Sequence, residues 1–407
     1  MNLQGKDASK QSSNMQIPIP FVQLLRTVFT FTIASVFLLD CGPAMTQDRM
    51  RARDLGITPG ILTPGALNAI TDVDGIRVGH RTLSRGSDIR TGVTVILPHD
   101  GNLYRERVPA AVYAGNGFGK ALGFTQIQEL GEIETPIGLT NTLSVHTVAN
   151  GITDYILNLP GNERVRSVNP VVGETNDGRL NRIRARVVSE DDVKMAIESA
   201  AGGFVEEGNV GAGTGTRALG FKGGIGTSSR VLPEEKGGYT IGVLVQSNFG
   251  GILQIDGAPV GEELGNHYMA QDVPYDVDGS IMIILATDAP IESRNLERLA
   301  KRAFLGIART GGFASNGSGD YVIAFSTHPD LRRQVDDEPV TLNPSLNNAS
   351  MTPLFLAAVE ATEEAIYNSL FMAETMTGKE GFTQPALPIE EVIPILKKYS
   401  AIEEPRR

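Results

Sequence analysis

Residues 276–290 read Asp-Val-Asp-Gly-Ser-Ile-Met-Ile-Ile-Leu-Ala-Thr-Asp-Ala-Pro, and this stretch joins a polar turn directly to an apolar run. The Asp-Val-Asp-Gly segment favours a turn, whereas the six residues after Ser280 are all apolar and include three isoleucines. A short apolar run bounded by turn residues is typical of a buried strand. We therefore predict a buried strand that begins at Ser280, within an α/β protein.

Ser280 stands where the turn meets this strand, and the position allows a specific chemistry. If the Gly279–Ser280 bond were cut, Ser280 would carry a free α-amine, whose reference pKa is about 7.7 to 8.0. Near neutral pH that amine would be able to take the proton of the serine's own hydroxyl, as in N-terminal nucleophile hydrolases. The alternative is that Gly-Ser is an ordinary turn sequence before a strand.

The composition indicates a folded, turn-rich protein, because 41% of the 407 residues are apolar, 46 are glycine and none is tryptophan. A chain of this length forms either one large layered α/β domain or two or three smaller domains. The net charge is −11, and the sequence has no basic stripe with interleaved aromatic residues. These features argue against a nucleic-acid-binding surface.

The first 44 residues differ from the rest of the chain. Basic residues precede an apolar run at 27–39, and small residues follow Cys41, a pattern typical of a signal peptide. The run is too short and too rich in threonine for a membrane span. We predict export to the periplasm, with Cys41 as a lipoprotein attachment site that Asp40 makes imperfect. A start assigned too far upstream would instead leave the protein in the cytoplasm.

The sequence lacks the motifs of metal and nucleotide sites. The five histidines form no HExxH or HxxxH pair, and Cys41 is the only cysteine, so neither a metal site nor a cysteine nucleophile is expected. Segment 114–121 has alanine where a phosphate-binding loop needs its first glycine and its Ser or Thr, and 211–216 lacks dinucleotide-binding spacing. No cofactor is predicted. A Ser-His-Asp triad stays open, although no G-x-S-x-G elbow occurs.

Hydrophobic periodicity predicts alternating strands and helices after a Gly-, Thr- and Pro-rich linker at 51–64. Residues 68–80 are predicted as short strands around a turn at Asp74-Gly75, and 222–230 as a loop. The other predicted strands are 91–97, 239–246, 280–286 and 321–326, and the predicted helices are 140–157, 191–201, 292–309, 354–370 and a short one near the C-terminus.

Five stretches in the same order resemble the self-processing L-aminopeptidase/D-esterase and β-peptidyl aminopeptidase family. The resemblance runs from about residue 60 to the end and implies a four-layered αββα sandwich of the N-terminal-nucleophile-hydrolase type. The matching stretches are NAITDVDGIRVGH (68–80), GNVGAGTGTRALGFKGGIGTSSR (208–230), GVLVQSNFGG (242–251), GSIMIILATDAP (279–290) and NGSGDYVIAFST (316–327).

This resemblance implies a precursor that cuts itself between Gly279 and Ser280 into an α-chain (45–279) and a β-chain (280–407) that stay associated. Ser280 would be the nucleophile of both processing and peptide hydrolysis. The family's assisting serine and acid match Ser318 and Asp320, although some relatives have Glu at the second position. In an extended segment, side chains two residues apart point to the same face.

Three further residues receive roles from the resemblance. Asn248 matches the family's side-chain donor to the oxyanion, and the alternative for Asn248 is a residue that merely ends a strand. Glu174 matches the site for the substrate's free amine, which a carboxylate binds by a charge-assisted hydrogen bond. Asn176 stands where some members carry a tyrosine that supports the oxyanion, so the resemblance does not carry their exact specificity over to this chain.

The expected substrates are short peptides, amino acid amides or esters, with L-, D- or β-amino acids at the N-terminus. The resemblance also implies a homotetramer of αβ units. One alternative is an N-acetyltransferase of the ornithine acetyltransferase type, although those enzymes expose a threonine. Another is an uncleaved exported binding protein for peptides or amines, and a third is an unprocessed, inactive relative.

Overall fold

Strand β11 (Ser280–Thr287) lies inside the larger of two stacked sheets. The computed structural model describes residues 49–270, 279–335 and 340–402, and the predicted leader lies outside them. Within the described residues the larger sheet has seven strands in the order β13-β3-β12-β11-β10-β9, with β4 paired to β3. The other members are β3 (Glu106–Gly117), β4 (Glu132–Ile133), β9 (Ile225–Val231), β10 (Thr240–Asn248), β12 (Gly319–Ser326) and β13 (Arg333–Gln334).

The smaller sheet has the strand order β1-β2-β5-β6 and packs directly on the larger one. The two sheets approach closely where Gly173 faces Met282, since a Cβ on Gly173 would lie 2.3 Å from the Met282 Cε. A larger residue at 173 would displace the Met282 side chain. The strands are β1 (Arg77–Arg85), β2 (Ile89–Leu97), β5 (Ile137–Asn141) and β6 (Val171–Thr175).

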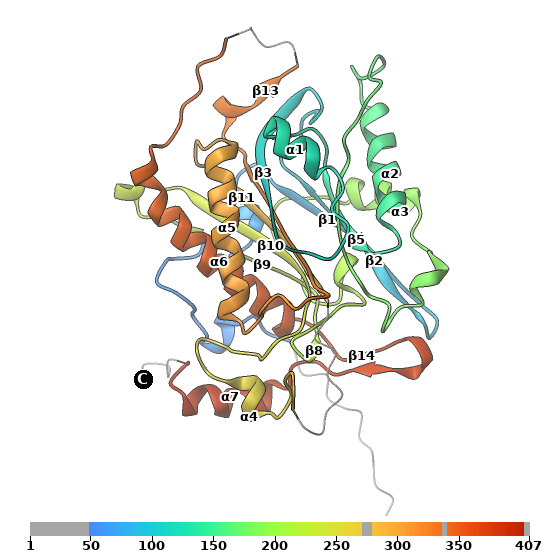
Figure 1. Cartoon of the computed structure of the whole chain (residues 1–407), viewed down its shortest axis with the longest axis vertical. Coiled ribbons are helices and arrows are strands. Elements are labelled where there is room, and N and C mark those ends of the chain that lie inside the picture. The colour runs from blue at the N-terminus through green and yellow to red at the C-terminus, as the bar shows by residue number, and fades with distance from the viewer. Residues whose placement is uncertain (1–48, 271–278, 336–339, 403–407) are drawn as a thin grey trace, which may run out of the picture. The chain divides into compact units, whose positions relative to one another are not determined.

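Helices cover the outer face of each sheet (Figure 1). Helices α2 (Val145–Leu157) and α3 (Glu190–Glu198) pack on the smaller sheet, and α5 (Ser293–Arg309) and α6 (Met351–Phe371) pack on the larger. The described residues therefore form four layers in the order helix, sheet, sheet, helix, which confirms the predicted αββα sandwich.

The apolar run of β11 is explained by its burial on both faces. Ile281, Ile283 and Leu285 belong to the core under α5 and α6, whereas Met282 and Ile284 belong to the core between the two sheets. All five side chains have no exposed surface. A strand covered on both sides needs apolar residues at every position, so it shows no alternation.

Three strand ends meet at one edge of the larger sheet because of how β10, β11 and β12 are connected. Helix α5 carries the chain from β11 back to the parallel strand β12, so both strands begin at the same edge. Strand β10 is antiparallel to β11, so its last residue lies at that edge too. Asn248, Ser280 and Gly319 consequently occupy adjacent positions across three strands.

The long periodic elements were predicted well. The helices predicted at 292–309 and 354–370 are α5 and α6, and the strand predicted at 91–97 is β2, which starts two residues earlier at Ile89. The helix predicted at 140–157 starts only at Val145, because Thr140 and Asn141 complete β5. The first predicted strand of 68–80 is a 3-10 helix, η2 (Ile70–Asp72).

The prediction of a loop at 222–230 was wrong. Residues 225–231 form β9, an edge strand of the larger sheet whose residues Thr227 to Arg230 are almost wholly buried. The linker prediction at 51–64 was also wrong, because Ala52 and Ile57 are completely buried in the core beneath α6. Both segments are polar or glycine-rich in sequence, and their burial depends on partners far along the chain.

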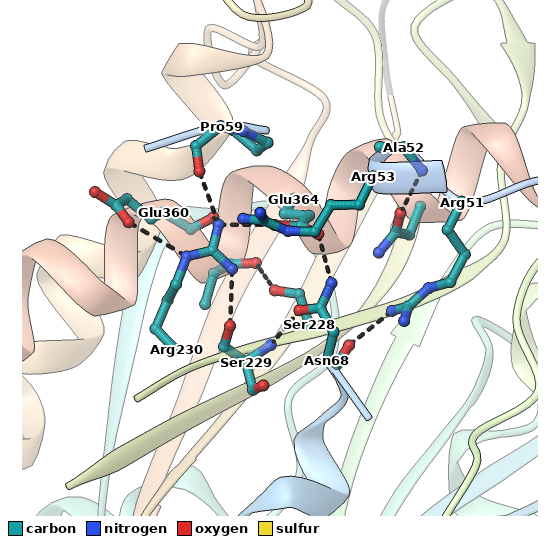
Figure 2. Close-up of polar contacts among 12 residues, drawn as sticks. Arg51, Ala52, Arg53, Pro59, Asn68, Ser228, Ser229, Arg230, Glu360 and Glu364 are labelled. Carbon is teal, nitrogen blue, oxygen red and sulfur yellow. Dashed lines mark hydrogen bonds and ion pairs between the residues drawn. The ribbon is translucent and has the colours of Figure 1, made fainter. Parts of the chain in front are cut away.

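Those partners form a buried polar cluster between β9, α6 and the segment near residue 53 (Figure 2). The Arg230 guanidinium lies 3.2 Å from Glu360 and 2.7 Å from Glu364, and all three side chains are 0% or 1% exposed. Arg53 reaches the other oxygen of Glu364 at 2.8 Å, and Arg230 also donates to the Pro59 carbonyl. The cluster thus fixes the 51–64 segment against α6.

The remaining elements are short and join these layers. No helix among the described residues is both long and apolar enough to cross a bilayer. The short elements are α1 (Phe124–Leu130), α4 (Val260–Glu263), α7 (Ile389–Lys398), the pairs β7 (Arg217–Ala218) with β8 (Phe221–Lys222) and β14 (Met376–Thr377) with β15 (Thr383–Gln384), and the 3-10 helices η1 (Arg53–Leu55), η3 (Ile183–Ala185), η4 (Gly211–Gly213), η5 (Glu234–Lys236), η6 (Pro329–Leu331), η7 (Asn348–Ser350) and η8 (Lys379–Gly381).

Candidate active site

Ser280 is the first residue of β11, and its side chain is held between two neighbouring backbone groups. Its Oγ donates to the Gly279 carbonyl oxygen at 2.5 Å and accepts from the Gly319 N–H at 3.3 Å. The same Gly319 N–H also lies 3.1 Å from the Gly279 carbonyl oxygen. The hydroxyl is therefore placed beside the Gly279–Ser280 peptide bond, with a backbone donor on that bond's oxygen.

Gly279 is required by the packing of this peptide. A Cβ on Gly279 would lie only 1.9 Å from the backbone oxygen of Asn248 on the adjacent strand. Such a distance is far below van der Waals contact, and a backbone atom cannot move away as a side chain can. Any other residue at 279 would displace the peptide bond from its place next to Ser280.

Ser318 and Asp320 are joined by a hydrogen bond, as their predicted shared face requires. The Ser318 Oγ donates to Asp320 Oδ1 at 2.6 Å, and both side chains are buried. Burial raises the pKa of Asp320 to about 6, against the opposing effect of the Ser318 hydroxyl. Its second oxygen, Oδ2, has no hydrogen-bond partner in the described part of the chain.

Strand register separates this pair from the Ser280 hydroxyl. Asp320 is the register partner of Ile281, so its side chain leaves the sheet on the face opposite to that of Ser280. The Ser318–Asp320 pair therefore lies toward the main chain of Ser280 and away from its hydroxyl. Asn116 on β3 holds the segment that leads into β12, because its Nδ2 donates to the carbonyl oxygens of Ser315 and Ser318.

Asn248 ends β10 with its carboxamide in a defined orientation. The Arg217 backbone N–H donates to its Oδ1 at 2.9 Å, and a backbone N–H is only ever a donor. The Nδ2 amino group therefore occupies the remaining position of the carboxamide and points away from the Arg217 N–H. Asn248 lines the same cavity as Ser280, so this donor group belongs to the wall around the nucleophile.

Glu174 is the fourth residue of β6. Its carboxylate accepts from the Lys120 backbone N–H at 3.0 Å and from the Thr142 hydroxyl, and it is 3% exposed. The Lys120 ammonium lies 3.8 Å away, beyond hydrogen-bond distance, and that side chain is half exposed. A cation is thus attracted to this carboxylate without being bound tightly.

A cavity of about 450 Å³ brings most of the predicted residues together. Ser280, Gly279, Asn248, Glu174 and Asn176 all line it, whereas Ser318 and Asp320 lie behind the strand and are not among its lining residues. The other residues of its wall are Phe118, Lys120, Thr142, Gly178, Arg179, Arg217 and Gly317.

The Asn176 carboxamide serves its own loop. Its Oδ1 accepts from the Gly178 N–H at 2.9 Å, which closes a tight turn after β6. Asn176, which stands where some relatives have a tyrosine, is therefore a turn residue. Among the described residues no hydrogen bond joins Asn176 to Ser280.

Sequence reasoning missed several residues of this site. Tyr321 is buried between the sheets, and its pKa is raised by burial and by the carboxylates of Glu174 and Asp320. Arg179 lines the cavity from a turn after β6, and Arg217 lines it from the start of β7. Lys120 belongs to the glycine-rich segment 114–121, in which Gly115 allows close packing, since a Cβ there would lie 2.0 Å from Phe304.

No group of three or more His, Cys, Asp or Glu side chains suited to a metal ion occurs in the described ranges. The chemistry available from the residues in place is a serine hydroxyl beside a scissile peptide, an oriented amide donor and a carboxylate for an amine.

Comparison with known proteins assigns the family. The model of peptidase family S58 matches residues 68–384. The chain belongs to peptidase family S58. Two curated relatives agree: the β-peptidyl aminopeptidase BapA of Sphingosinicella microcystinivorans is 42% identical over 379 residues, 88% of this chain and 94% of the relative. That of Sphingosinicella xenopeptidilytica is 40% identical over 369 residues, 85% and 91% of the two chains.

Two solved structures of aminopeptidases have the same fold. A β-aminopeptidase from a Burkholderia species has a TM-score of 0.80 and 41% identity, with 88% of this chain and all of the other covered. The L-aminopeptidase D-Ala-esterase/amidase of Ochrobactrum anthropi has a TM-score of 0.80 and 37% identity, with 87% and 99% covered. The latter is a prototype of the serine aminopeptidases and a variant of the Ntn hydrolase fold. This S58 protein is accordingly an aminopeptidase with an Ntn-hydrolase fold.

Proposed function

We propose that this S58 protein is a self-processing serine aminopeptidase. It cleaves its own Gly279–Ser280 bond and then releases N-terminal residues from short peptides, amides or esters through an acyl-enzyme on Ser280. The observation that carries the proposal is the position of Ser280. Its hydroxyl contacts the carbonyl of the residue before it, and it lines one cavity with Glu174 and Asn248.

Processing is an N-to-O acyl shift in this proposal. The Ser280 Oγ attacks the Gly279 carbonyl carbon, and the Gly319 N–H stabilises the charge that develops on the carbonyl oxygen. The C–N bond then breaks, and the nitrogen takes up the proton that the hydroxyl has lost. An ester now joins Gly279 to the Ser280 oxygen. Water hydrolyses this ester, which leaves a carboxylate on Gly279 and a free amine on Ser280.

Peptide hydrolysis then uses the same hydroxyl. The substrate's ammonium group binds Glu174, where it replaces the loosely held Lys120. The Ser280 hydroxyl gives its proton to its own α-amine and attacks the substrate's first carbonyl, while the Asn248 amide stabilises the oxyanion. The shortened peptide leaves with a proton, and water hydrolyses the acyl-enzyme to free the first residue.

Ser318 and Asp320 are assigned to the α-amine. They lie on the backbone side of Ser280, where the new amine forms, and not on the side of the cavity. The Ser318 hydroxyl would link the amine to the Asp320 carboxylate and so allow protons to leave and return. Asp320 accepts a proton only in its ionised form, which a pKa of about 6 provides at neutral pH.

The relatives guide the choice of substrates. Two proteins at 42% and 40% identity are β-peptidyl aminopeptidases, so peptides with an N-terminal β-amino acid are the first class to test. L-amino acid amides and D-alanine esters follow, because the Ochrobactrum enzyme is an L-aminopeptidase and D-Ala-esterase/amidase.

The test is the intact mass of the purified protein with N-terminal sequencing of each fragment. Processing gives a β-chain of 128 residues (407 minus 279), roughly 14 kDa, that begins Ser-Ile-Met-Ile. Ser280→Ala should give one uncut chain without peptidase activity, and Ser199→Ala, an exposed serine at the end of α3, should behave as the wild type. A Ser280→Ala protein that still yields two fragments would disprove the proposal.

We also propose export and a homotetramer of αβ units. The leader-like composition of residues 1–44 supports export, and the family resemblance supports the assembly. Sequencing the N-terminus of the α-chain isolated from a periplasmic fraction tests the first, since an exported chain lacks the leader. Sedimentation equilibrium tests the second, because a monomer mass would contradict it.

A further inference from the structure

The charges that line the cavity are unequal. Lys120, Arg179 and Arg217 contribute three cations, whereas Glu174 is the only carboxylate in the described wall. The whole chain, in contrast, carries a net charge of −11. A substrate ammonium explains the carboxylate, and the excess of positive charge in the described wall favours an anionic group on the same substrate.

Arg179 is the cation best placed to bind such a group. Its guanidinium stacks over the ring of Phe382, with 4.1 Å between the guanidinium carbon and the ring centroid. Stacking uses the flat face of the guanidinium and leaves its N–H groups at the edge. Among the described residues Arg179 forms no ion pair, so no carboxylate of that part of the chain occupies the paired donors that suit a planar carboxylate.

The loop that carries Arg179 is fixed at both ends. The Asn176 carboxamide closes the turn to Gly178, and the Leu180 carbonyl accepts from the Lys379 N–H at 2.7 Å. The second contact ties the loop to the C-terminal hairpin of β14 and β15, which also holds Phe382 between its strands. Arg179 and its stacking partner are therefore positioned before any substrate binds, which lowers the entropy cost of recognition.

We propose that Arg179 binds the C-terminal carboxylate of a short peptide whose N-terminal ammonium is bound by Glu174. This inference rests on the proposed function and specifies its substrate class. Both groups line the same cavity, whose volume of about 450 Å³ suits a small molecule. Di- and tripeptides with a free carboxylate are therefore the substrates to test. Arg217 adds positive charge to the same wall.

The test compares matched substrates on three forms of the purified enzyme. The substrates are β-alanyl-L-alanine, its C-terminal amide, and β-alanyl-L-aspartic acid α-amide, in which the only carboxylate is on the side chain. The enzymes are the wild type, Arg179→Ala and Arg184→Ala, a control that removes an exposed arginine of the next turn outside the cavity. Release of β-alanine is followed to obtain kcat and KM for each pair.

The wild type and Arg184→Ala should prefer the free acid over its amide by about tenfold in kcat/KM, mostly through KM. Arg179→Ala should lose that preference while its rate on the amide changes less than about twofold. Equal kcat/KM of the wild type on acid and amide, or an equal loss on both substrates in Arg179→Ala, would overturn this inference and leave the proposed function standing. So would an aspartyl amide that is cleaved as well as the free acid. A wild type that hydrolyses none of the three, nor L-alanyl-L-alanine, would instead show that the proposed function is wrong, and the inference with it.

Discussion

Asn248 and Ser280 are register partners, the last residue of β10 and the first of β11. Directly opposed residues of an antiparallel pair project from the same face of the sheet, so the amide and the hydroxyl share the cavity. The register is fixed by the apolar side chains that follow along both strands. A slip by one residue would turn one of the two groups to the opposite face.

Asn248→Asp tests the amide as a donor without removing its structural contact. An aspartate keeps an oxygen for the Arg217 N–H but replaces the donating amino group by a second oxygen. We expect kcat to fall by about 10² to 10³, the usual cost of one oxyanion donor. Thermal unfolding should change little for Asp, whereas Asn248→Ala should lose stability as well. Unchanged kcat in Asn248→Asp would remove Asn248 from the mechanism.

Glu174→Gln separates substrate binding from self-processing. Glutamine keeps one oxygen that can accept from the Lys120 N–H, and its amino group can donate to the Thr142 hydroxyl oxygen, but the charge that an ammonium requires is removed. Loss of a charge-assisted hydrogen bond of about 1.5 to 3 kcal/mol predicts a fall in kcat/KM of roughly 10- to 100-fold, mainly through KM. Processing should proceed at the wild-type rate, because the precursor presents no free amine there. Slow processing in Glu174→Gln would show that this carboxylate acts on the nucleophile.

The sequence predicted the parts of the fold that depend on local pattern. Strand β11 and helices α5 and α6 have apolar residues at consecutive or helical spacing over long runs, and these signals do not depend on distant partners. Strand β9 was missed because its buried residues are polar. Arg230 becomes a core residue only through Glu360 and Glu364, which lie more than a hundred residues away.

Dependence on residues far along the chain also limits what could be predicted of the site. Ser280, Ser318 and Asp320 were found from the strand starts and the family resemblance, and their placement follows from two-residue alternation. Arg179 carries no such signal. Its role depends on a cavity wall shared with Ser280 and on Phe382, which belongs to a hairpin about two hundred residues later. Such groupings are tertiary and leave no pattern in the local sequence.

Asp320 should give the enzyme an acid limb in its pH profile. Its pKa is raised to about 6, and a proton acceptor works only when ionised, so activity should fall as pH falls through about 6. Asp320→Asn should lower kcat by about 10² to 10⁴ and remove that limb. The check is kcat against pH between 4.5 and 9 for both proteins. A limb that persists in Asp320→Asn belongs to another group.

The same shift predicts an effect on stability with a definite sign. The folded pKa lies above the usual value of 3.8, so protonated Asp320 stabilises the fold below about pH 4, and this contribution is lost as pH rises through about 6. At pH 8 the shift corresponds to a cost of about 3 kcal/mol. Asp320→Asn, which cannot ionise, should therefore unfold at a higher urea concentration than the wild type at pH 8. A lower urea midpoint for Asp320→Asn would mean that contacts stabilise the buried carboxylate.

The buried cluster around Arg230 should hold the two chains together after processing. Its arginines, Arg53 and Arg230, precede Ser280 in the sequence, whereas Glu360 and Glu364 follow it, so the three ion pairs Arg53–Glu364, Arg230–Glu360 and Arg230–Glu364 would each join the two chains of a processed protein. Removing one partner of a buried pair leaves the other charge uncompensated, which costs about 3 to 5 kcal/mol.

Glu364→Ala is the sharpest test, because this carboxylate contacts both Arg53 and Arg230 and is not among the residues that line the cavity with Ser280. The variant should be processed, since the Gly279–Ser280 bond is untouched, but its chains should separate at a lower urea concentration than those of the wild type. Glu390→Ala, an exposed acid on α7, is the matched control and should not differ from the wild type. Size-exclusion chromatography of the processed proteins across a urea series measures the separation. Equal midpoints for Glu364→Ala and the wild type would mean that apolar packing alone keeps the chains associated.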